Sequence, residues 1–211
     1  MEDDNIYRPP QADMEAPAPE ALGKPATSAP FFQTSPVKVA VLSIATFGLY
    51  RLVWFYRQWA RRKEHGDDVS PLARTLFIVF FVYGLFQSVN EEIDLRERLE
   101  IAQRAPSESP SMPGKSIAPL QAGLLALLFI GLSLVGYAVG RVQGATALGL
   151  GSTMLSCVPL AIVQKKINEL NASLGYDPGE GTAFTAGSIA ALILGALCWI
   201  PVVIGLFGIK R

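Results

Sequence analysis

The stretch from residue 120 to residue 139, "LQAGLLALLFIGLSLVGYAV", has no charged side chain at any of its twenty positions. A helix needs about 20 apolar residues to cross the roughly 30 Å of hydrocarbon in a bilayer, so this stretch predicts a transmembrane helix. Half of the 211 residues are apolar and only 17% are charged, whereas soluble domains have about 25% charged residues. Together these features predict an all-α integral membrane protein.

Four other apolar stretches accompany the first. Those at 145–163 and 184–207 are also free of charge, and the one at 37–56 carries a basic residue toward each end. The stretch at 72–89 is short and carries Arg74. It either spans the bilayer with Arg74 at the interface or is re-entrant. We therefore predict a helical bundle of four or five transmembrane helices.

Composition divides the chain into four regions. Residues 1–36 contain seven prolines, with six acidic residues against two basic ones, which is typical of a disordered acidic tail. The start "MEDDN" lacks the positive charge of a secretory signal. Residues 37–90 form a two-helix membrane region, 91–119 a charged amphipathic helix with a Pro/Ser linker, and 120–211 a three-helix transmembrane region.

The charged helix is predicted from its ion-pair spacing. Three acidic residues each stand four positions before a basic one, in the pairs Glu92–Arg96, Asp94–Arg98 and Glu100–Arg104. Such pairs stabilise an exposed helix. A narrow apolar stripe runs along it, formed by Leu95, Leu99 and Ala102. The helix is either a solvated continuation of the membrane helix or a docking helix for a partner.

Aromatic and basic residues crowd the segment "FGLYRLVWFYRQWARRKEHG", residues 47–66. We interpret it as a membrane-interface collar, an aromatic belt at headgroup level followed by a basic cytoplasmic segment. Arg51 is expected to reach the interface through its long side chain. Anionic headgroups are attracted to such a cluster, while the zero net charge argues against nucleic acid. The collar comprises Tyr50, Trp54, Tyr56, Arg57, Trp59, Arg61, Arg62 and Lys63.

The orientation follows from the basic residues in the loops. Five of them lie between residues 57 and 74, which favours the cytoplasm for that loop. With five spans, the basic residues of the loops are divided almost equally between the two sides of the membrane. Their excess on the cytoplasmic side increases if residues 72–89 are re-entrant, because both flanking loops then lie in the cytoplasm.

The sequence lacks the usual signs of catalysis. No Asp or Glu lies within the five apolar stretches, His65 is the only histidine, and both cysteines lie inside apolar runs. We predict no catalytic residue, no cofactor and no metal site, and hence no enzyme. Candidate polar or kink positions inside the membrane are Thr153, Ser156, Pro159 and Pro201. Proline-interrupted helices are either simple kinks or, as a pair, a transporter site.

Two weaker patterns in the sequence are a repeat of small residues and a similarity between two short segments. Small residues recur every four positions at Ala183, Gly187, Ala191 and Gly195, which suits close packing within the chain or in a homo-oligomer. The segments "QSVNEE" from Gln87 and "QKKINE" from Gln164 each follow an apolar run with a Gln and then Asn-Glu. This similarity is either a worn duplication or chance.

The region from about residue 37 to residue 90 resembles a known family. Its signature residues are Phe47 to Tyr50, Trp54 to Tyr56, Trp59, Lys63, Glu64, Ser70 and Pro71. They are similar to the motif of the bacterial inner-membrane proteins called domain of unknown function 4234. The resemblance implies a multi-pass protein of the bacterial cytoplasmic membrane and no particular activity. Our leading hypothesis is a non-enzymatic scaffold or regulatory protein, with lipids and a protein partner or a second copy as binding partners. The alternative is a small uncoupled transporter or channel that uses Pro159 and Pro201.

Overall fold

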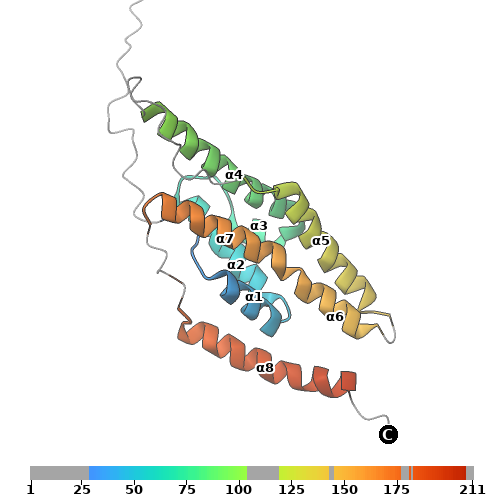
Figure 1. Cartoon of the computed structure of the whole chain (residues 1–211). Coiled ribbons are helices and arrows are strands. Elements are labelled where there is room, and N and C mark those ends of the chain that lie inside the picture. The colour runs from blue at the N-terminus through green and yellow to red at the C-terminus, as the bar shows by residue number, and fades with distance from the viewer. Residues whose placement is uncertain (1–28, 104–118, 143–144, 177–180, 182, 208–211) are drawn as a thin grey trace, which may run out of the picture.

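A computed structural model describes residues 29–103, 119–142, 145–176, 181 and 183–207 (Figure 1). This part of the chain is all-helical, which confirms the predicted fold class. The helices are α1 (Pro36–Ala45), α2 (Leu49–Glu64), α3 (Pro71–Leu76), α4 (Ile78–Gln103), α5 (Ala122–Val139), α6 (Thr146–Leu155), α7 (Cys157–Ser173) and α8 (Ala186–Phe207).

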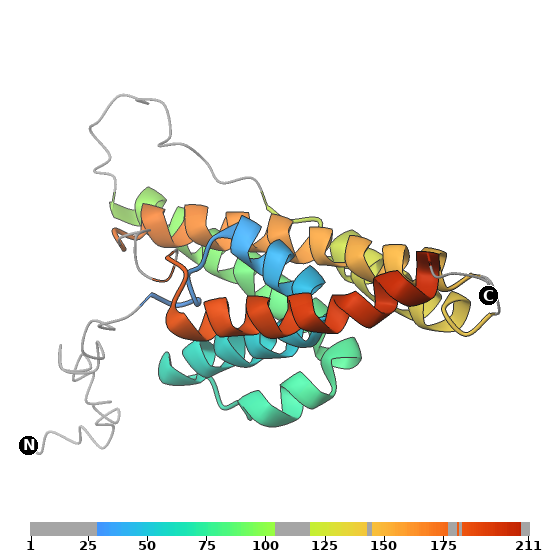
Figure 2. The same ribbon diagram turned by 90° about the horizontal axis from the view of Figure 1, so that it is seen from below.

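Three helical segments are long and apolar enough to cross a membrane. They are Ala122–Val139, Thr146–Ser173 (α6 and α7 together) and Ala186–Gly205. They overlap the three charge-free stretches of the sequence and give the protein three candidate membrane spans by length and apolar composition. Helices α5 and α6–α7 lie side by side (Figures 1 and 2).

The stretch 37–56 is not the single helix that its hydropathy predicts. Helix α1 ends at Ala45, and the chain reverses through Thr46, Phe47 and Gly48 into α2. Thr46 Oγ1 donates to the Leu42 carbonyl at 2.7 Å and accepts the Tyr50 N–H at 2.9 Å. Gly48 has a φ of 89°, which glycine adopts without steric cost. The result is a helical hairpin, and α1 is only a short apolar helix.

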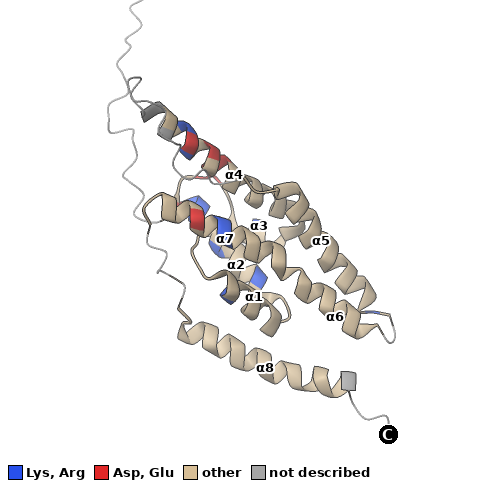
Figure 3. Ribbon diagram, viewed as in Figure 1, with Lys and Arg blue, Asp and Glu red and all other residues tan. Residues whose placement is uncertain are grey.

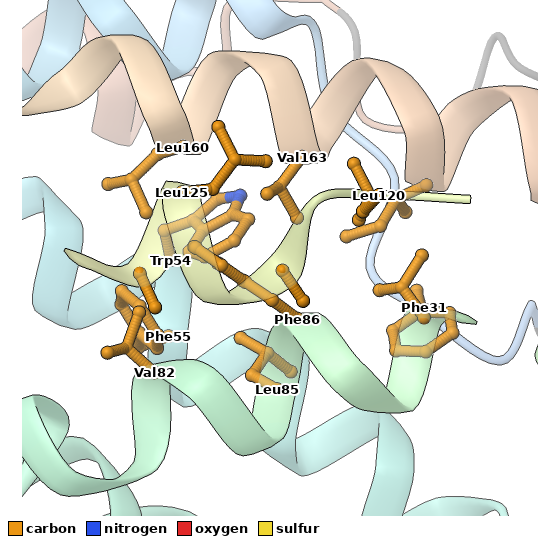
Figure 4. Packing of buried hydrophobic residues seen from close by; sticks show 14 of the residues in the cluster. Phe31, Trp54, Phe55, Val82, Leu85, Phe86, Leu120, Leu125, Leu160 and Val163 are labelled. Atoms are coloured by element: carbon orange, nitrogen blue, oxygen red, sulfur yellow. The ribbon is translucent and has the colours of Figure 1, made fainter. Parts of the chain in front are cut away.

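The stretch 72–89 is also interrupted. The six-residue helix α3 ends at Leu76, Phe77 interrupts the helical pattern, and α4 then continues for 26 residues through the predicted charged helix as far as Gln103. Helix α4 runs in the same direction as α2, since Phe55 lies beside Val82 (Figure 4) and Arg62 pairs with Glu92. The two-helix description of residues 37–90 is therefore wrong, because both hydropathy maxima contain a turn.

Most of the charges gather at one end of the bundle, here called the charged pole (Figure 3). It contains the segment 29–35, the end of α2, the second half of α4 and the end of α7. These parts are joined by side-chain contacts such as Asn171 Nδ2 of α7 to the Phe31 carbonyl at 2.9 Å and Arg62 of α2 to Glu92 of α4 at 3.0 Å. Among the described charged residues, Arg141 alone lies at the opposite end.

The segment before α1 packs against the bundle. Phe31 is fully buried and belongs to the hydrophobic core, so the prediction of a disordered tail is wrong for residues 29–36. The rest of that tail, residues 1–28, and residues 104–118 of the predicted linker lie outside the described residues.

The hydrophobic core lies between α2, α4, α5 and α7 (Figure 4). Its largest members are aromatic, and the Trp54 and Phe55 rings meet edge to face at 5.0 Å. Helix α8 is outside this core and packs mainly on α1. Gly195 of α8 lies so close to the Ala45 carbonyl that no side chain would fit there. Most of α8 is exposed in the isolated chain, as expected for a helix that faces lipid.

Candidate functional site: a half-buried arginine at the hairpin tip

Arg51 lies one turn beyond the α1–α2 reversal and points into the bundle. Its Nη1 donates to Ser156 Oγ at 2.5 Å and to Ser133 Oγ at 3.3 Å, and its Nε donates to the Gly48 carbonyl at 3.2 Å. Ser133 is six residues before the end of α5, about 9 Å of helix rise. Arg51 therefore does not reach the interface as predicted.

The charge of Arg51 has no acidic partner. None of the ion pairs among the described residues involves it. The Phe129 ring, whose centroid is 5.7 Å from the guanidinium carbon, supplies a weaker cation–π contact. A guanidinium has five N–H groups, and the two on Nη2 have no hydrogen-bond acceptor among the residues described. Arginine at membrane depth is costly, so an unpaired one marks a candidate functional site.

The helix break between α6 and α7 places Ser156 Oγ against Arg51. Pro159 has no N–H to bond the Leu155 carbonyl, and the helix breaks at Ser156. Ser156 Oγ accepts from Arg51 and donates to the Thr153 carbonyl at 2.6 Å. The interruption lies three residues before Pro159, where a helix loses a backbone hydrogen bond to the proline. Pro201, in contrast, lies inside the continuous helix α8.

A cavity of about 70 Å³, the tip cavity, adjoins the guanidinium. It lies between the hairpin tip, α6, the start of α7 and α8. Its lining residues are Ser43, Ile44, Phe47, Gly48, Arg51, Leu150, Thr153, Met154, Cys157 and Trp199. Of the four predicted intramembrane positions, Thr153 lines the cavity. Ser156 does not line it but is hydrogen-bonded to Arg51, which does. Pro159 and Pro201 are not in the lining. The structure therefore does not bring the two prolines together at one site.

Two details of the tip cavity are unusual. The Ser43 side chain is 4% exposed, and its hydroxyl has no hydrogen-bond partner within the described structure. Phe47 has a φ of 51°, a strained value for a bulky residue, and its ring stacks on Trp199 with centroids 4.6 Å apart. Trp199 Nε1 also donates to the Ile44 carbonyl at 3.3 Å. Strained residues of this kind cluster at functional sites.

An open apolar groove, the α1–α8 groove, adjoins the tip cavity. It is lined by Val41, Ile44, Ala45, Leu192, Ala196 and Trp199. Ile44 and Trp199 line both spaces, so these two side chains lie between the tip cavity, which Arg51 adjoins, and the apolar groove.

The predicted collar is divided by the fold. Trp54 is 0% and Trp59 2% exposed, so their assignment to an aromatic belt at the lipid headgroups is corrected. Both face the core because α3 and α4 cover that side of α2. Tyr56 and Arg57 remain exposed and Tyr50 is half-buried.

The basic members of the collar also differ from one another. Arg62 pairs with Asp67 at 2.7 Å and with Glu92 at 3.0 Å, and its side chain is largely buried. Arg61 pairs with Glu64 at 3.0 Å near the surface, and Lys63 is exposed. Arg62 therefore joins α2 to α4, while the other basic side chains remain near the surface.

Side-chain amides form a cluster that the sequence analysis missed. Gln164 Oε1 accepts the Trp54 Nε1–H at 2.6 Å and a Gln58 amide N–H at 3.2 Å. Gln58 Oε1 in turn accepts the Phe32 N–H at 3.0 Å. The four members of this amide cluster, all hydrogen-bonded to the backbone of residues 31–34, are Gln58, Gln164, Asn168 and Asn171. In the sequence, the only sign of this cluster was the segment "QKKINE", which contains Gln164 and Asn168.

The described residues contain no group of three His, Cys, Asp or Glu side chains placed to hold a metal ion. The most distinctive chemistry of the fold is the unpaired Arg51 beside the tip cavity. Comparison with models of known families, with curated proteins and with solved structures gives no match to this chain.

Proposed function

We propose that the protein is a non-enzymatic membrane scaffold or regulator that binds a partner through the second half of α4. One observation carries this proposal. Leu95 and Leu99 are 50% and 53% exposed, and they lie four residues apart on one side of a helix. Exposed leucines in a row on a charged helix fit the groove of a partner protein.

This half of α4 is fixed firmly at its base. Asn90 exchanges two hydrogen bonds with the backbone of Leu120, at 2.7 and 3.0 Å. Glu92 accepts from the largely buried Arg62. The helix continues without a break to Gln103, so the two leucines are presented on a rigid support, which lowers the entropic cost of binding.

The proposed topology places this surface in the cytoplasm of a bacterium. Helices α5, α6–α7 and α8 cross the cytoplasmic membrane, and the α1–α2 and α3–α4 units enter from the charged pole and return to it. Eight or more basic residues then share one side with the charged pole, which agrees with the positive-inside rule. The prediction of four or five spans instead requires the α3–α4 unit, or both units, to cross.

Cysteine accessibility distinguishes these topologies. Single cysteines replace Asp67, Asp94, Arg141 and Tyr176 in a background without Cys157 and Cys198, and intact cells are treated with an impermeant thiol reagent. Three crossings predict labelling at position 141 only. Labelling at position 94 but not at position 67 would show that residues 72–89 span the membrane.

Site-specific photocrosslinking tests the partner surface. A photoreactive amino acid at Leu95 or Leu99 is expected to yield a discrete protein adduct in native membranes. The matched control is Glu97, which is exposed on the opposite side of the same helix. Adducts of equal yield at all three positions, or adducts with lipid alone at the two leucines, would contradict the proposal.

A further inference from the structure

We infer that the tip cavity and the α1–α8 groove together form a binding site for a single-chain acidic amphiphile, such as a long-chain fatty acid. In this arrangement the acidic group lies in the tip cavity against Arg51. The acyl chain lies along the groove between α1 and α8. This site is separate from the α4 surface and does not depend on the proposed docking function.

The first step in the argument is the unused hydrogen-bonding capacity around the cavity. The two N–H groups of Arg51 Nη2 lack acceptors, and the Ser43 hydroxyl lacks any partner among the described residues. Arg51 is half-buried, whereas the Ser43 side chain is 4% exposed. Buried polar groups are nearly always hydrogen-bonded, so the unpartnered Ser43 hydroxyl calls for an occupant. A carboxylate or phosphate oxygen accepts from both groups and also compensates the charge of Arg51.

The second step is that the guanidinium is already oriented. Ser133 and Ser156 hold Nη1, and the Gly48 carbonyl holds Nε. A side chain on residue 48 would collide with the guanidinium, so glycine at the tip provides its space. An arginine fixed from one side presents its remaining donors to a ligand with little further loss of entropy.

The third step is the size and connection of the two spaces. About 70 Å³ exceeds the volume of one water molecule, about 30 Å³ in the liquid, and suits a small acidic group. The adjoining groove is almost wholly apolar and is bounded by one helix on each side. Ile44 and Trp199 line both spaces, and in the proposed complex Trp199 rotates away from the Ile44 carbonyl to join them.

The test uses the full-length protein in nanodiscs of neutral phosphatidylcholine, with tritiated oleate as the probe and empty nanodiscs as the background. We expect saturable binding that unlabelled oleate displaces and methyl oleate, which has no negative charge, does not. Arg51→Gln is expected to bind oleate at least about tenfold more weakly, since it removes charge-assisted hydrogen bonds. Arg141→Gln, which removes an exposed arginine of the α5–α6 loop that does not line the tip cavity, is the matched control and is expected to bind like the wild type.

Further competitors identify the acidic group. If unlabelled oleate displaces the probe and oleoyl lysophosphatidate does not, the site takes a carboxylate. If both displace the probe, the site takes any single-chain acid. Both results support the inference. Displacement by acetate or inorganic phosphate at the same concentrations would overturn the role of the groove, and equal displacement by methyl oleate would overturn the role of the charge.

A second variant guards against misfolding of Arg51→Gln. Ser43→Leu fills the tip cavity and leaves the hydrogen bonds of Arg51 to Ser133, Ser156 and Gly48 in place. It is expected to lose oleate binding by about tenfold or more while retaining the circular dichroism spectrum of the wild type. Wild-type binding by Ser43→Leu, or by a folded Arg51→Gln, would overturn the inference. Neither variant changes α4, so crosslinking at Leu95 reports separately on the docking function.

Discussion

Replacing Gln164 by Leu tests whether the amide cluster holds the α1–α2 hairpin to α7. Gln164 is fully buried, and leucine has a similar volume, so the change removes polar atoms without opening a large cavity. It leaves the Trp54 Nε1–H and one Gln58 N–H without acceptors. Each orphaned buried donor costs about 1–3 kcal/mol. The free energy of unfolding should therefore fall by about 2–6 kcal/mol.

Unfolding in detergent by increasing the fraction of sodium dodecyl sulfate, followed by tryptophan fluorescence and circular dichroism, measures this loss. The matched control is Gln87→Leu, since the Gln87 side chain is half-buried and makes no hydrogen bond within the described structure. Its effect should stay within about 0.5 kcal/mol.

A double-mutant cycle isolates the Trp54 contribution. Trp54→Phe removes the N–H that Gln164→Leu would orphan, so the double variant should be less destabilised than the sum of the singles by about 1–2 kcal/mol. The reasoning would be refuted if Gln164→Leu cost less than about 1 kcal/mol, or if the two changes were additive.

Three further variants address the hairpin and its neighbours, all measured by the same unfolding assay. Gly195→Leu should separate α8 from the α1 backbone and lower stability, whereas Gly205→Leu, with open space around it, should not; equal effects would argue against the close helix contact. Gly48→Ala should cost about 1–3 kcal/mol because its φ is positive, and a neutral result would contradict that tip geometry. Arg62→Gln should lower the free energy of unfolding by about 1–2 kcal/mol, because it removes two ion pairs. Arg61→Gln, at a more exposed pair, should lower it by at most about 0.5 kcal/mol. Similar losses for the two variants would mean that Arg62 does not join α2 to α4.

Hydropathy predicted the three long membrane helices because each is a continuous apolar run that needs no partner to be recognised. It failed for residues 37–56 and 72–89, since an average over a window does not detect a reversal within it. The first reversal did have local signals in the sequence. Thr46 supplies a side-chain oxygen that accepts a backbone N–H of α2, and Gly48 adopts a positive φ without steric cost. At the second, Phe77 carries no comparable signal, and the break depends on tertiary packing.

The candidate site was only partly predictable. The sequence singled out Thr153 and Ser156 as polar residues in an apolar helix, and the Pro159 kink follows from the chemistry of proline. The position of Arg51 was wrongly predicted because a long basic side chain near the end of an apolar run normally reaches the interface. Its actual direction depends on the hairpin, which brings it opposite Ser133, 82 residues later in the chain.

The amide cluster has a consequence for the order of events during synthesis. The hairpin emerges from the ribosome early, but its hydrogen-bond partners follow much later: Gln164 is 110 residues after Trp54, and Asn171 is 140 residues after Phe31. Until α7 is made, the Trp54 indole N–H and the Phe31 and Thr34 carbonyls have only water in place of their α7 partners. The hydrogen bonds that fix the first hairpin to the rest of the bundle are therefore completed only when the last quarter of the chain has been synthesised.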